Sequence, residues 1–105
     1  MIEVVRDAQG RRIYLTDERW RHIIDIHREM RPCRVHVLKT LRLGRRRQDP
    51  LDPAKYKYSR TFDDLPTNST HVVVVVKFES RFRSEKTEES NNFVLTAYLV
   101  SRLKG

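Results

Sequence analysis

The chain has 105 residues, of which 38% are hydrophobic and 34% are charged, so residues 1–105 have the length and composition of a single domain. The longest uninterrupted apolar run is residues 72–76, whereas a membrane-spanning helix needs about 20 apolar residues. We therefore expect no membrane partner and a cytoplasmic location. Cys33 is the single cysteine, which excludes an internal disulfide and a zinc site built from several cysteines.

The net charge of +8 favours a phosphate-bearing partner. Residues 1–47 hold 13 basic and 6 acidic groups, so most of the excess lies in the first half of the chain. Arginine outnumbers lysine 16 to 6, which favours bidentate phosphate contacts and stacking on bases. The alternative is an ordinary solvated basic surface.

The N-terminal region predicts a hairpin followed by a helix. Residues 2–6 and 12–15 are β-prone and flank a loop that ends in Gly10. Thr16 is a suitable N-cap, and the apolar positions after it recur at helical spacing as Trp20, Ile23, Ile24 and His27. We expect this helix to run to about Met30 and to stop at Pro32.

A second helix is predicted to start near Pro32 or Cys33 and to run to Leu43, with Gly44 as a left-handed residue at its C-terminal end. Residues 45–55 contain Arg45, Arg46 and Arg47 followed by two prolines, and we interpret them as a basic loop. Residues 55–62, 71–79 and 92–102 then follow strand patterns. The expected fold is α+β, with an N-terminal hairpin and two helices packed on one face of a four-stranded antiparallel sheet.

Alternation along the strands predicts which side chains face away from the helices. In the last strand we expect Phe93, Leu95, Ala97 and Leu99 to face the core, and in the strand before it the even-numbered valines 72–76. Either face of residues 55–62 could point outward, and we assign the tyrosines and Arg60 to the open side. The open face would then display Tyr58, Arg60, Lys77, Thr96 and Tyr98.

Aromatic rings beside cations suit single-stranded RNA, because unstacked bases lie on the rings while the cations hold the backbone. The alternative is ordinary cross-strand pairing of good strand formers. Arg45, Arg46 and Arg47 would add phosphate contacts that do not depend on base sequence.

Four short motifs, in order, resemble the barnase, EndoU, colicin and RelE-like ribonuclease superfamily, in particular its phage-associated branch. They are LTDERWRHI at residues 15–23, HREM at 27–30, VK at 76–77 and NFVLTAY at 92–98. Such RelE-like and barnase-like proteins place helices first and then a curved sheet that carries the site. The resemblance implies a small, metal-independent endoribonuclease without a cofactor. It is commonly a toxin restrained by a partner, which for this basic chain would be an acidic antitoxin or immunity protein.

The resemblance implies attack by the 2′-hydroxyl of the RNA itself, which needs a proton acceptor, a proton donor and fixed positive charge. His27 would transfer protons, Lys77 and Arg60 would stabilise the phosphorane, Thr96 would bind a phosphate oxygen, and Tyr98 or Tyr58 would stack a base or donate a proton. Each has a structural alternative, since His27 falls in the apolar stripe of its helix. No metal site is expected, because Cys33 and His36 lack further ligands. The alternative function is a non-catalytic RNA-binding or regulatory module.

Overall fold

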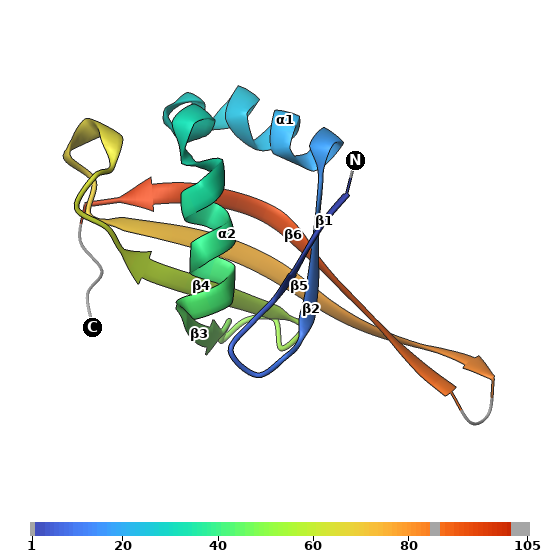
Figure 1. Cartoon of the computed structure of the whole chain (residues 1–105). Coiled ribbons are helices and arrows are strands. Elements are labelled where there is room, and N and C mark those ends of the chain that lie inside the picture. Colours follow the sequence, from blue (N-terminus) through green and yellow to red (C-terminus); the bar gives the residue numbers. More distant parts are fainter. Residues whose placement is uncertain (1, 85–86, 102–105) are drawn as a thin grey trace.

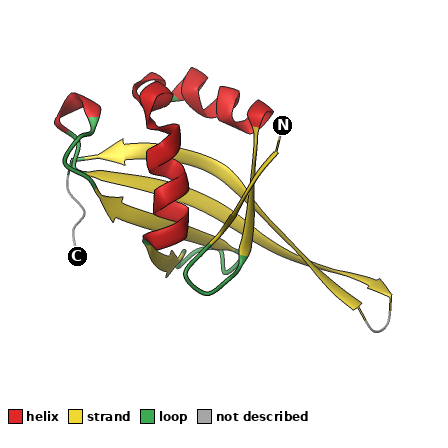
Figure 2. Cartoon of the chain, viewed as in Figure 1, coloured by secondary structure: helices red, strands yellow, loops and turns green. Residues whose placement is uncertain are grey.

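The computed structural model describes residues 2–84 and 87–101 and has an α+β architecture with two helices and a six-stranded mixed sheet (Figures 1 and 2). Arg102, expected at the end of the last strand, lies outside these residues. No helix in the described part of the chain is long and apolar enough to cross a membrane. The elements are β1 (Ile2–Arg6), β2 (Arg12–Thr16), α1 (Asp17–Ile26), α2 (Arg34–Leu43), β3 (Arg45–Gln48), β4 (Lys55–Thr61), β5 (His71–Ser84) and β6 (Thr87–Val100).

The strand order is β1-β2-β6-β5-β4-β3, so the expected four-stranded antiparallel sheet is wrong in two respects. The N-terminal hairpin belongs to the sheet, because Tyr14 of β2 pairs in parallel with Phe93 of β6. The basic segment is strand β3, which pairs antiparallel with β4, rather than a loop. Pro50 and Pro53 lie in the turn after β3, and charged side chains are tolerated on an edge strand.

Helix α1 begins as predicted and ends four residues early. The Thr16 hydroxyl accepts a hydrogen bond from the Arg19 amide at 3.0 Å, which caps the helix. Beyond Ile26 the chain turns into a 3-10 helix, Arg28–Cys33, that contains Pro32. Proline has no amide hydrogen and its ring clashes with the preceding turn, so the α-helix cannot continue.

Gly44 ends α2 in an extended conformation, with φ −74° and ψ 166°, so the expected left-handed conformation is wrong. Glycine is required there for space. A Cβ atom would lie 2.4 Å from the Thr40 carbonyl oxygen and 2.7 Å from that of Ser59. The missing side chain therefore allows β3 to start directly from the helix end, against β4.

Helix α2 crosses one face of the sheet, and α1 lies beside β6 (Figures 1 and 2). Under α2, the β5 valines Val72, Val74 and Val76 are fully buried, as predicted. In β6 the pairing shifts by one residue, because Val75 faces Thr96 while Val76 faces Val94. This extra residue in β6 forms a β-bulge, and the residues of β6 that precede it face the side opposite to the one predicted. Val94 is therefore buried in the core, where the prediction placed Phe93 and Leu95.

The assignment of the β4 tyrosines and Arg60 to the open face is also wrong. The register places Tyr56, Tyr58 and Arg60 opposite the buried valines of β5. Tyr58 is 1% exposed. Strand β4 therefore turns its tyrosines inward and its two lysines outward.

A buried hydrogen bond explains how a tyrosine hydroxyl is accommodated in the core. Tyr58 donates to a carboxylate oxygen of Asp7 at 2.5 Å, and the other Asp7 oxygen accepts from the backbone amides of Gln9 and Arg11. Burial alone would raise the pKa of Asp7, but the hydrogen bonds from Tyr58, Arg11 and Gln9 outweigh it and lower the pKa below its ordinary value. Burial and the contact with Asp7 raise the pKa of Tyr58. The contact fixes the hairpin loop to β4.

Replacing Tyr58 by phenylalanine removes the donor and leaves the Asp7 carboxylate buried without it. We expect the free energy of unfolding to fall by about 1–3 kcal/mol, measured by urea titration. Tyr56→Phe is the matched control, because the Tyr56 hydroxyl has no hydrogen bond among the described residues. Equal stability of the two variants would show that the Tyr58 hydroxyl is not needed.

The lowered pKa of Asp7 predicts a loss of stability in acid. The contribution is complete above the unfolded-state pKa, about 3.9 for an aspartate, and is lost as the pH falls towards the lower folded-state pKa. Urea titrations between pH 5 and pH 2 should show a steeper decline for the natural chain than for Asp7→Asn. Parallel curves would contradict the assignment.

Candidate functional site

The sheet face opposite α2 is called the open face. The buried valines of β5 and the residues paired with them face α2. The residues that alternate with these along each strand therefore lie on the open face. Among the residues whose side chains are described, its members are Arg45 and Arg47 of β3, Lys55, Lys57, Ser59 and Thr61 of β4, His71, Val73, Val75, Lys77 and Glu79 of β5, and Asn91, Phe93, Thr96, Tyr98 and Val100 of β6.

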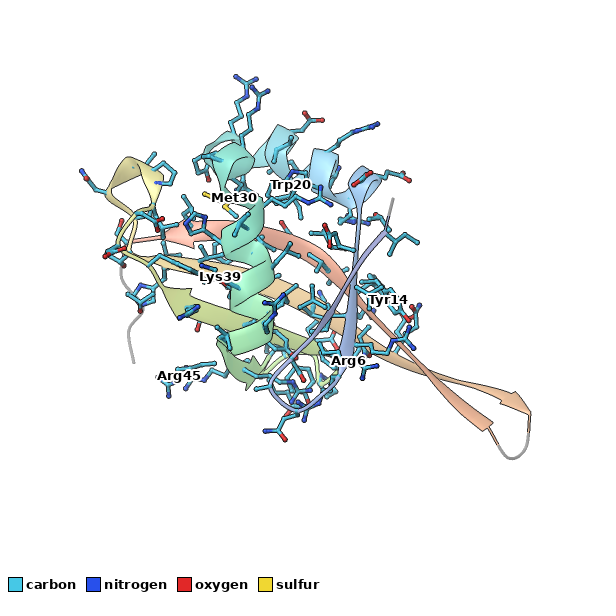
Figure 3. The ribbon with its side chains drawn as sticks, viewed as in Figure 1. Arg6, Tyr14, Trp20, Met30, Lys39 and Arg45 are labelled. Atoms are coloured by element: carbon cyan, nitrogen blue, oxygen red, sulfur yellow. The ribbon has the colours of Figure 1, made fainter. Side chains whose placement is uncertain are left out.

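Five cations of this face form one group on β3, β4 and β5, here called the cationic patch: Arg45, Arg47, Lys55, Lys57 and Lys77. Arg47 lies directly opposite Lys57, and Lys55 lies directly opposite Lys77. Arg45, Arg47 and Lys57 are exposed, and the other two are partly buried. The side chain of Arg45 extends outward beside β3 (Figure 3). The patch can therefore offer several positive charges to one polyanion.

His27 lies at the β6 side of the sheet. It forms the C-cap of α1. Its carbonyl oxygen accepts a hydrogen bond from the Met30 amide at 2.9 Å, and this bond begins the 3-10 helix. Its ring centroid is 6.1 Å from that of Tyr98. Its Nδ1 atom is 3.7 Å from a carboxylate oxygen of Glu29, and both side chains are partly exposed. An imidazole, a phenol and a carboxylate are thus gathered at an accessible edge.

Four of the five residues expected to be catalytic lie on this side of the molecule. Thr96 and Tyr98 share the open face of β6, and His27 contacts that strand's edge. On β5, Val75 is paired with Thr96, and Lys77 lies two positions further along the strand. His27, Tyr98 and Thr96 supply a proton carrier and hydroxyls at this edge. Lys77, four positions along β5 from Val73, the partner of Tyr98, places a positive charge about 13 Å further along the strand.

Arg60 does not belong to this group. Its register places it on the helix side, where its guanidinium lies 5.3 Å from the Phe62 ring. It lines a cleft of about 410 Å³ at the β4 side of the sheet together with Arg45 and His71. His71, whose Nδ1 atom is 2.6 Å from the Thr70 hydroxyl, matches no motif spacing and was not predicted.

Two of the four residues expected to bind RNA also face inward. Tyr58 is buried against Asp7. The guanidinium of Arg46 lies 3.5 Å from the centroid of the Tyr56 ring, and its Nε atom is buried without a hydrogen-bond partner. Arg45 and Arg47, which alternate with Arg46 on the strand, remain exposed.

Lys55, Lys57 and Phe93 were missed as members of the open face. The alternation of lysine and tyrosine in β4 allows either orientation, and the one observed brings Tyr58 into contact with Asp7, 51 positions away in the chain. Phe93 faces outward because of the bulge in β6, which the strand pattern does not announce. Nothing in the local sequence distinguishes the two arrangements.

Among the side chains that the structure describes, those of residues 2–79 and 91–101, no three or more His, Cys, Asp or Glu are grouped in a way that suits a metal ion. Comparisons of the chain with protein-family models, curated proteins and solved structures find no match. The geometry of the chain's own residues is therefore what supports a function.

Proposed function

We propose that the protein is a metal-independent endoribonuclease that binds RNA on the open face and cleaves it beside His27. The observation that carries this proposal is the contact between the His27 and Tyr98 rings at the edge of a face that also bears Thr96 and Lys77. The motif resemblance to the barnase, EndoU, colicin and RelE-like superfamily supports the same activity.

The proposed reaction needs only the RNA and these side chains. His27 accepts the proton of a 2′-hydroxyl, whose oxygen bonds to the adjacent phosphorus while the bond from phosphorus to the 5′-oxygen breaks. The Tyr98 hydroxyl supplies the proton to the departing oxygen. Thr96 stabilises the extra negative charge on the phosphorane, and Lys77 contributes its positive charge from further along β5. The products are a 2′,3′-cyclic phosphate and a free 5′-hydroxyl.

Glu29 is a positioning residue in this scheme. Its carboxylate faces the Nδ1 side of the His27 ring, so a hydrogen bond there would leave Nε2 as the proton acceptor. Arg60, on the helix side, has no role in it.

An enzyme of this kind can act as a toxin, and its inhibitor would then be an acidic antitoxin or immunity protein. The cationic patch is the surface that such a partner would cover.

The cationic patch also supports a second candidate, a non-catalytic RNA-binding or regulatory module. Its charges favour binding to a phosphate backbone whether or not His27 transfers a proton. The two candidates differ in the fate of the bound RNA.

Purified protein incubated with labelled RNA in EDTA should produce fragments with cyclic-phosphate ends. We expect His27→Ala to slow cleavage by about 10²–10⁴-fold, because a positioned acid or base contributes that much, and Lys77→Ala to slow it as well. His22→Ala, at an exposed position on α1, and Arg60→Gln should retain activity.

Tight binding of RNA that stays intact would favour the module. Unchanged cleavage by His27→Ala would overturn the assignment of the site.

A further inference from the structure

We propose that the cationic patch is a track for single-stranded RNA that leads to the His27 edge and makes the protein act on strands of several nucleotides in preference to dinucleotides. The cleavage readout rests on the proposed function, whereas the binding readout does not. The track comprises Arg45, Arg47, Lys55, Lys57 and Lys77, with Phe93 and Tyr98 of β6 beyond them.

The arrangement of charge in the track is unfavourable for an isolated sheet. Like charges directly opposite each other on neighbouring strands destabilise the pairing. This face has two such pairs, Arg47 with Lys57 and Lys55 with Lys77. A polyanion lying over them would turn this mutual repulsion into attraction, which is the strongest indication of a ligand at this surface.

One described carboxylate shares this face with the five cations, that of Glu79, two positions beyond Lys77 on β5. Among the described residues none of the five cations forms an ion pair with a carboxylate. Arginines on other parts of the molecule do, since Arg11 pairs with Asp7 and Arg34 with Asp17. Their charge is therefore available to an external partner.

The dimensions and the aromatic side chains favour a single strand of RNA. Strands β3 to β6 are separated by three spacings of about 4.8 Å, so the track is about 14 Å wide. A stacked strand rises about 3.4 Å per nucleotide, so about four nucleotides fit across it. At the far side Phe93 and Tyr98 are partly exposed rings on which unpaired bases can stack. Bases in a duplex or side chains of an acidic protein gain less from such rings.

The binding test uses the exposed cations Arg45, Arg47 and Lys57, which lie outside the proposed catalytic group. Their triple replacement by glutamine should lower the slope of log affinity against log salt by about 2, because each single-strand phosphate contact contributes about 0.7. Fluorescence anisotropy with a 12-nucleotide RNA, measured in a His27→Ala background, gives the slope. The control replaces three exposed helix cations, Arg21, Lys39 and Arg42, by glutamine and should leave the slope nearly unchanged.

The cleavage test compares the 12-nucleotide RNA with a dinucleotide, using active protein. The patch variant should raise KM for the long RNA about tenfold and so reduce the preference of the protein for the long RNA over the dinucleotide, whereas the helix control should keep that preference. Absence of cleavage of either RNA by the natural chain would refute the proposed function, while the anisotropy result would still decide the track.

Three results would overturn the track: an unchanged salt slope in the patch variant, an equal loss in the helix control, or duplex RNA bound as tightly as the single strand. Polyglutamate that displaces the RNA at equal charge concentration would assign the surface to an acidic protein instead.

Discussion

The hydrogen bond between Tyr58 and Asp7 is the constraint on which the arrangement of the molecule depends. It satisfies a hydroxyl and a carboxylate that would be costly to bury alone. It also joins the loop of the N-terminal hairpin to β4, a strand at the other side of the sheet. Side chains alternate between the two faces of a strand, and Lys57 and Lys55 lie one and three positions from Tyr58. Because Tyr58 points inward, both lysines must point outward. One buried pair thereby sets the charge of the opposite face.

Local sequence signals predict the local parts of this fold. The hairpin around Gly10, the Thr16 cap, the two helices and the valine strand are each specified by residues close together in the chain. The predictions fail where distant contacts decide. Arg45–Gln48 becomes a strand because the free edge of β4 is available to it, and α1 ends at Ile26 although the apolar spacing continues to His27.

The candidate site shows the same division. His27, Lys77, Thr96 and Tyr98 come from motifs in three separate segments, and the sheet register brings them to one side. Arg60 and Tyr58 were placed with them by alternation alone, which sorts a strand into two faces without telling which one is buried. The early end of α1 matters equally, since a longer helix would carry His27 within a regular turn and change its approach to Tyr98.

The bulge in β6 has a consequence for attachment as well as for polarity. By reversing the alternation of the strand, it turns Asn92 inward, where its side-chain amide donates to the Arg12 carbonyl oxygen at 2.9 Å. The same reversal turns Phe93 outward. A single inserted residue thus allows Asn92 to anchor the N-terminal hairpin to β6 and places the ring of Phe93 on the opposite surface. Deleting that residue would remove the anchoring hydrogen bond and the exposed ring together.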